Sequence, residues 1–117
     1  EPSAAIRWLQ GKGDVIKHFH AKDSLVYQWN ARVNGVLDTK HYGDEPNRAW
    51  IFRSVGYGHG EDVWRDMIST LRMMGYDGVL SIEHEDSLMT ADEGFRKGAA
   101  LLKQVVISEA AGPMTWA

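Results

Sequence analysis

Residues 75–86 have the sequence GYDGVLSIEHED, and this stretch decides the expected fold. Gly75 stands where a glycine commonly ends a helix, and residues 78–83 predict an apolar strand. Glu83 follows at the end of that strand, where an ionised carboxylate is costly unless a cation or a metal ion pairs with it. The acidic residues after Glu83 fit a solvated turn. The stretch therefore predicts a strand that ends in a functional carboxylate.

Elements predicted on either side of this stretch alternate between helix and strand. Apolar side chains at three- and four-residue spacings predict helices over residues 61–74 and 91–108. A short helix is expected near the N-terminus, capped near Ser3. Residues 14–23 predict a strand that runs out into a polar loop.

The long segment between these elements, residues 24–60, is expected to be mostly irregular. Within it, residues 25–27 and 49–52 are apolar enough to be short strands or packed loop segments. A loop of that length is uncommon in a compact domain and often has a binding role. Its aromatic-rich part, from Trp29 to Trp50, is a candidate contact with a neighbouring subunit, so a homo-oligomer is one expectation.

Two histidines lie near the end of the first predicted strand. Strand alternation puts Ile16, His18 and His20 on the same face. Ligands of parallel α/β proteins sit at the carboxyl ends of the strands, and charged residues follow His20 there. The spacing alone fits either a ligand site or histidines that line a polar interior or form hydrogen bonds in a core.

Alternating strands and helices indicate an α/β protein with a parallel sheet. Only two strands stand out, and two parallel strands would leave both edges of the sheet open. We therefore expect the chain to be part of a larger folded unit. Residues 1–109 would form that part, and residues 110–117, which have no periodicity, a terminal tail.

The composition limits the chemistry and the partners. The 117 residues include no Cys, so a metal ion would be held by His and carboxylate groups, which suit Mn²⁺, Mg²⁺, Co²⁺ or Zn²⁺. The formal net charge of −3 argues against a nucleic-acid partner, since nucleic-acid-binding surfaces are usually basic. No apolar run approaches the roughly 20 residues of a membrane-spanning helix, and residues 1–3 lack the form of a signal peptide. We therefore expect no membrane contact and a cytoplasmic location.

Four segments occur in an order that is typical of one family. They are HFHAKD at residues 18–23, FRSVGYGH at 52–59, Trp64, and GYDGVLSIEHED at 75–86. Together they resemble the last third of the sugar phosphate isomerase/epimerase family, within the xylose isomerase-like TIM barrel superfamily. The resemblance implies an α/β fold that is the C-terminal part of a (β/α)8 TIM barrel, about its last two strands and three helices.

The resemblance also implies roles for individual residues. His20 matches the metal-binding histidine at the end of the family's seventh strand. Glu83 matches the glutamate ligand at the end of the eighth strand, which also takes part in proton transfer. Arg53, before a Gly-x-Gly turn, is similar to an arginine that contacts substrate in related epimerases, although the loop between His20 and Arg53 is far longer here. His18 and Lys22 are candidate substrate contacts, or else solvated or pocket-lining residues.

The implied site is held only in part by this chain. The family's other metal ligands, a Glu and an Asp, come from earlier strands that are absent here. The rest of the barrel would come from a longer chain or from another chain. His59 and His84 are expected to be structural or exposed.

These expectations favour a metal-dependent isomerase or epimerase that acts on a small polyol, sugar or sugar phosphate. A proton next to the carbonyl would be transferred through an enediolate, with Glu83 as the base. An inosose dehydratase-type lyase on the same barrel is one alternative, and a non-catalytic barrel fragment or binding module is another. The DNA-repair nuclease branch of the superfamily is disfavoured by the acidic charge balance and by the lack of an Asp-Arg-His triplet near the seventh strand.

Overall fold

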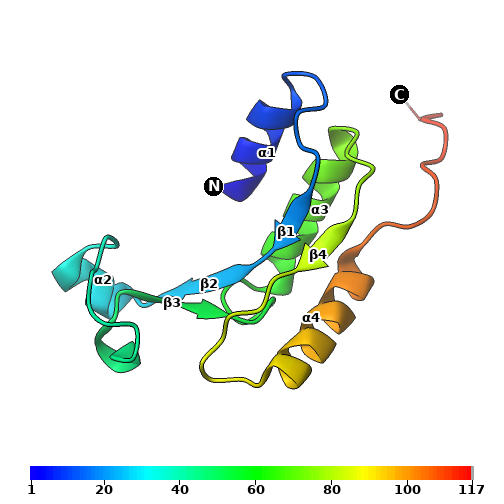
Figure 1. The fold of residues 1–117 in the computed structure, drawn as a ribbon. Helices are drawn as coiled ribbons and strands as arrows, with labels where there is room; N and C mark the ends of the chain where they lie inside the picture. The colour runs from blue at the N-terminus through cyan, green and yellow to red at the C-terminus, as the bar shows by residue number, and fades with distance from the viewer. Residues whose placement is uncertain (117) are drawn as a thin grey trace.

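Helices and strands alternate along much of the chain, as Figure 1 shows. The structure, a computed structural model, describes residues 1–116. Its elements, in order, are α1 (Pro2–Gln10), β1 (Phe19–Ala21), β2 (Asp23–Val26), α2 (Gln28–Asn34), the 3-10 turn η1 (Glu45–Asn47), β3 (Trp50–Arg53), α3 (Glu61–Met73), β4 (Leu80–Ile82) and α4 (Ala91–Val105). The helices predicted over residues 61–74 and 91–108 are confirmed as α3 and α4, and α4 ends three residues earlier than expected.

Strands β1 and β4 form a parallel pair at the centre of the fold. Their register joins Phe19 to Leu80, His20 to Ser81 and Ala21 to Ile82. Alternate side chains of the pair point toward the helices, where Ala21 is fully buried and Phe19, Leu80 and Ile82 pack on the core. The pair thus has one apolar face and one polar face.

The apolar face rests on a core to which α1, α3 and α4 all contribute. Its buried residues are Ile6, Ala21, Val55, Trp64, Met67, Ile68, Leu71, Leu102 and Val105. Burial of each large apolar side chain contributes roughly 1.5–3 kcal/mol relative to exposure. Helix α1 packs mainly on α3, and α3 also contacts α4. This core fixes the parallel pair and the residues that follow its strands.

The turn between α3 and β4 follows the prediction at Gly75. This glycine has a φ of 78°, in the left-handed region that side chains with a Cβ rarely adopt. The Gly75 amide donates to the carbonyl of Arg72 at 3.0 Å, and the Tyr76 amide donates to that of Leu71 at 2.9 Å. These bonds satisfy carbonyls at the helix end and turn the chain toward β4.

The start of α1 differs from the prediction. Glu1, rather than Ser3, caps the helix, because its carboxylate accepts the amides of Ser3 at 3.0 Å and Ala4 at 3.1 Å. Pro2 lacks an amide hydrogen and suits the first helical turn, so the helix begins there. Ser3 is instead buried inside the helix, and its hydroxyl donates to Asp66 of α3.

The first strand is shorter than the predicted residues 14–23. It begins at Phe19, so strand alternation does not extend back to Ile16. Ile16 packs against the apolar core, whereas His18 and His20 are exposed. The prediction that all three share one face was therefore wrong for Ile16 and is confirmed for the two histidines.

The segment 24–60 forms an arm with more regular structure than the sequence indicates. Strands β2 and β3 are antiparallel, with Asp23 opposite Arg53 and Val26 opposite Trp50, and they confirm the two short strands predicted there. Helix α2 was not predicted, because it buries no residue and leaves Trp29 65% exposed, so it lacks an apolar stripe. In Figure 1 the part of the arm that holds α2 and η1 extends away from α3 and α4, and the chain measures 53 × 30 × 26 Å.

Within residues 1–116, β1 and β4 pair only with each other, so the barrel is not closed in this chain. Strands β2 and β3 and helix α2 come in addition to the two barrel strands and three helices that the resemblance implies. None of the helices in this part of the chain has both the length and the apolar character needed to cross a bilayer.

Candidate functional site

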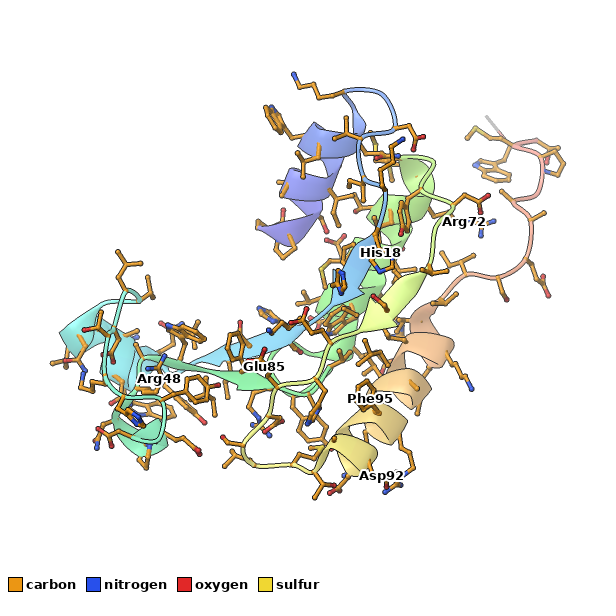
Figure 2. All side chains as sticks on the ribbon, in the orientation of Figure 1. His18, Arg48, Arg72, Glu85, Asp92 and Phe95 are labelled. Atoms are coloured by element: carbon orange, nitrogen blue, oxygen red, sulfur yellow. The ribbon has the colours of Figure 1, made fainter. Side chains whose placement is uncertain are left out.

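The polar face of the parallel pair carries two histidines and a serine. The rings of His18 and His20 have centroids 4.6 Å apart. Ser81, on β4, places its hydroxyl 2.7 Å from Nε2 of His18 and 3.3 Å from Nδ1 of His20. Figure 2 shows His18 beside β1 and Glu85 in the segment that follows β4. The histidines predicted for the site therefore share one open face of the sheet.

Glu83 lies beside His20, as the prediction of a shared site requires. Its amide donates to the carbonyl of Ala21 at 3.0 Å, which extends the strand ladder by one residue and fixes the backbone. Oε2 of Glu83 is 3.8 Å from Nδ1 of His20, and the two side chains are 44% and 62% exposed. A hydrogen bond from Lys22 lowers the pKa of Glu83, so this carboxylate is ionised at neutral pH.

Lys22 lies between two carboxylates of this segment. Its Nζ is 2.8 Å from Oε1 of Glu83 and 2.9 Å from Oε1 of Glu85. The ammonium also lies 4.2 Å from the centroid of the Phe52 ring, a cation–π contact. Hydrogen bonds to Glu83 and Glu85 raise the pKa of Lys22.

His20 and Glu83 have the chemistry and spacing of two metal ligands. Bonds from Mn²⁺, Mg²⁺, Co²⁺ or Zn²⁺ to imidazole nitrogen or carboxylate oxygen are about 2.0–2.2 Å long, so one ion could contact two atoms 3.8 Å apart. Two ligands are fewer than such ions usually need from a protein. Among residues 1–116 there is no group of three or more His, Cys, Asp or Glu placed to hold an ion. The residues thus fit half of a metal site.

Arg53 lies on β3, the strand that pairs with β2, and it is bound to Asp86. Its Nε donates to Oδ2 of Asp86 at 3.1 Å, and its guanidinium lies 5.5 Å from the centroid of the Tyr57 ring. The Arg53 side chain is 13% exposed. Arg53 is thereby held beside the segment that begins with Glu83, without a direct bond to His20 or Glu83 in the described structure.

Asp86 is a buried carboxylate. The prediction that it lies in a solvated turn was therefore wrong. Its side chain is 0% exposed, and besides Arg53 it accepts the amide of Ser54 at 2.7 Å, the hydroxyl of Ser54 at 3.0 Å and the amide of Leu88 at 2.8 Å. Burial acts to raise the pKa of Asp86, but the hydrogen bonds from Ser54, Leu88 and Arg53 outweigh it and leave the pKa lowered. This carboxylate joins β3 to the segment after β4.

Asp23 is a second buried carboxylate, and sequence reasoning gave it no role of its own. Oδ2 accepts the amides of Gly56, Gly58 and His59 at 2.9–3.1 Å, and Trp64 Nε1 lies 3.4 Å from the same oxygen. Oδ1 is 2.7 Å from Nδ1 of His59. Asp23 thereby fixes the turn after β3 against the start of β2.

Gly58 allows the turn after β3 to lie close to Asp23 and Ser24 at the start of β2. A Cβ at this position would lie 2.2 Å from the carbonyl oxygen of Ser24 and 2.6 Å from Oδ1 of Asp23. The useful signal in the sequence was a Gly-x-Gly-His turn, whose amides need an acceptor, together with Asp23 at the end of the predicted strand 14–23. The contact between the two was hard to predict because Asp23 and Gly58 are 35 residues apart in the sequence.

The two remaining histidines near this region have structural partners. His59 is bound to Asp23, and Nδ1 of His84 lies 3.3 Å from the Ser54 hydroxyl. The His84 ring also contacts Phe95 of α4, with centroids 5.6 Å apart. Both histidines are thus held by partners other than His20 and Glu83.

The parallel strands, with their polar ends and the helices packed on the opposite face, form a small α/β unit. A comparison with known families matches residues 4–105 to the xylose isomerase-like TIM barrel family, and the chain belongs to that family. Members of this family are mostly sugar isomerases and epimerases and are typically metal-dependent.

One relative illustrates the size of such proteins. The chain is 39% identical over 106 residues to the uncharacterized protein YfiH of Bacillus subtilis (strain 168). The match covers 91% of this chain and 33% of YfiH, so the chain spans about a third of the length of that curated relative.

Proposed function

We propose that the protein containing this chain is a metal-dependent isomerase or epimerase of a sugar or sugar phosphate. The observation that supports this most is the His20–Glu83 pair, with Nδ1 and Oε2 3.8 Å apart on an open polar face at the ends of adjacent parallel strands. Carboxyl ends of parallel strands are where barrel enzymes bind their substrates. Membership of a family of mostly sugar isomerases and epimerases adds the reaction class.

The chain's own residues would divide the work between binding and proton transfer. His20 and Glu83 would hold a divalent ion, either Mn²⁺, Mg²⁺, Co²⁺ or Zn²⁺. When bound, such an ion acts as a Lewis acid that polarises adjacent substrate oxygens. Glu83, ionised at neutral pH, would also take the proton from the carbon next to the carbonyl, which leaves an enediolate.

Two further residues would contact the substrate. His18, exposed beside His20, would bind a substrate hydroxyl through its ring. Arg53 would stabilise negative charge that develops on oxygen, and Asp86 would keep its guanidinium oriented toward the acidic segment.

The proposed site is completed outside this chain. We propose that β1 and β4 are the seventh and eighth strands of a (β/α)8 barrel, and that residues 1–109 form its C-terminal part. The length of YfiH, about three times the matched region, supports a longer polypeptide as the source of the other strands. A Glu and an Asp at the ends of those strands would supply the remaining ligands. The intact mass of the native protein and the sequence before residue 1 test this arrangement.

The reaction is tested in the full-length protein by proton exchange with solvent. The protein, supplied with Mn²⁺ or Co²⁺, would be incubated in D₂O with a panel of sugars, sugar phosphates and inososes. We expect deuterium to appear on the carbon next to the carbonyl of at least one compound. E83Q should abolish this exchange.

A matched control separates this effect from general damage. Glu93 on α4 also pairs with a lysine, since its Oε1 lies 2.8 Å from Nζ of Lys97, and it is 43% exposed. E93Q should therefore exchange as the wild type does. Absence of exchange across the whole panel would contradict the proposal, and loss of water from a substrate would assign the lyase reaction instead.

A further inference from the structure

We propose that Lys22 is a positioning residue, which holds the Glu83 carboxylate so that Oε2 faces His20. This inference rests on the proposed function, because it concerns the same metal site. It replaces the expectation that Lys22 contacts the substrate directly.

The residues on both sides of Lys22 are buried and hold its backbone in place. Ala21, before it, is 0% exposed at the end of β1, and Asp23, after it, is 3% exposed and carries the hydrogen bonds to the Gly56–His59 turn. Alternation along an extended chain then sends the Lys22 side chain to the face opposite Ala21 and Asp23, which is the face of His20. Two buried neighbours therefore fix the position of the Lys22 Cα, from which the side chain extends.

The Lys22 ammonium contacts one carboxylate oxygen of Glu83, and the other oxygen faces His20. Oε1 lies 2.8 Å from Nζ of Lys22, whereas Oε2 lies 3.8 Å from Nδ1 of His20. With Oε1 bound, the carboxylate cannot rotate freely, and Oε2 stays directed toward the imidazole. A lysine on Oε1 and a divalent ion on Oε2 can thus be accommodated together.

The second anchor of the ammonium is Glu85, at 2.9 Å, and the Phe52 ring lies on another side with its centroid at 4.2 Å. An ammonium has three N–H donors, and two of them are used by carboxylates. A substrate oxygen would have to displace one of these partners. Both carboxylate partners of Lys22 lie in the segment that follows β4, so the lysine ties the end of β1 to that segment.

The charge balance also fits a lysine that orients a metal ligand, rather than a lysine that takes the place of the metal ion. Lys22 carries one positive charge against the two negative charges of Glu83 and Glu85, so the group keeps a net charge of −1. The lysine relieves the repulsion between the two carboxylates, yet the group still attracts a divalent cation. A partner that orients a ligand in this way typically changes metal affinity by about 10–100-fold when it is removed.

The first experiment measures Mn²⁺ binding to the full-length protein by calorimetric titration, without substrate. K22M, which keeps most of the stem but removes the charge, should raise the Kd for Mn²⁺ by about tenfold or more. K22R should restore the Kd to within about threefold of wild type, because it keeps a donor for Glu83. K97M, which breaks the similar pair on α4, should leave the Kd unchanged. An unchanged or lowered Kd in K22M would overturn the inference.

The second experiment does not depend on metal binding or on turnover. Crystal structures of the metal-free full-length wild type and K22M would show whether the Glu83 carboxylate keeps its direction. We expect Oε2 to face His20 in the wild type and the carboxylate to adopt a different or a mixed orientation in K22M. An identical carboxylate position in both proteins would contradict the positioning role.

These readouts separate Lys22 from the proposed reaction. If deuterium exchange fails while K22M still weakens Mn²⁺ binding and turns Glu83, the reaction is wrong and the role of Lys22 stands. If exchange occurs but K22M only raises KM, with Mn²⁺ binding and Glu83 unchanged, Lys22 contacts substrate and the inference is wrong.

Discussion

Asp23 begins strand β2 and Glu83 directly follows strand β4, and the two carboxylates differ in how many of their acceptor positions are filled. The Asp23 side chain is 1% exposed and accepts four backbone amides, those of Ser24, Gly56, Gly58 and His59, with the side chains of His59 and Trp64 also in contact. Glu83 is 44% exposed, and Lys22 occupies one of its oxygens. A carboxylate offers about four lone-pair sites, so Asp23 has none left for a ligand, while Glu83 has one oxygen open toward His20.

This difference distinguishes residues that hold the loops from a residue that can do chemistry. Asp23 joins the turn at Gly56–His59 to the start of β2, and Asp86 joins β3 to the segment after β4. Both carboxylates are buried and hydrogen-bonded, and in the sequence they follow His20 and Glu83 by three residues each. Substitutions should therefore affect stability at the saturated carboxylates and metal binding at the open one.

The largest loss of stability is expected for D23A. Its removal would leave buried amides of the Gly56–His59 turn without an acceptor, and loss of one partner of a buried charged network costs about 3–5 kcal/mol. The free energy of unfolding, from chemical denaturation of the full-length protein, measures this effect. A loss below about 1 kcal/mol would show that the turn does not depend on Asp23.

A smaller loss, about 2–3 kcal/mol, is expected for D86N, which weakens the hydrogen bonds from Ser54, Leu88 and Arg53. The same group predicts a pH dependence. Because folding lowers the pKa of Asp86 below its ordinary value of 3.8, its contribution is present above that pH and is lost as pH falls through the folded pKa. Wild-type stability should therefore drop below about pH 4 more steeply than that of D86N. Parallel curves for the two proteins in acid would contradict this account.

The sequence predicted the parts of the fold that depend on local patterns. The apolar spacing of α3, its stop at Gly75 and the strand before Glu83 all arise from neighbours within a few residues. The position of His20 beside Glu83 was also predictable, because parallel strands bring their carboxyl ends together.

The remaining features depend on contacts between distant parts of the chain. Asp86 looks like a solvated residue in the sequence, and only the approach of Ser54, 32 residues away, buries it. Helix α2 buries no residue, and the hydrogen bonds that tie it to the rest of the arm run from Asn30 to the carbonyls of Pro46 and Arg48, 16 and 18 residues away. The capping by Glu1 is local, but the sequence offered Ser3 as a competing cap of the preferred type.

The smallest change in stability and the largest change in metal binding are both expected at Glu83. The most direct test is a calorimetric Mn²⁺ titration of full-length wild type, E83Q and E93Q, with the melting temperature of each protein recorded alongside. We predict that E83Q melts as the wild type does but binds Mn²⁺ at least about tenfold more weakly, while E93Q matches the wild type in both measurements. Wild-type affinity for Mn²⁺ in a folded E83Q protein would contradict the assignment of the open carboxylate as the metal ligand.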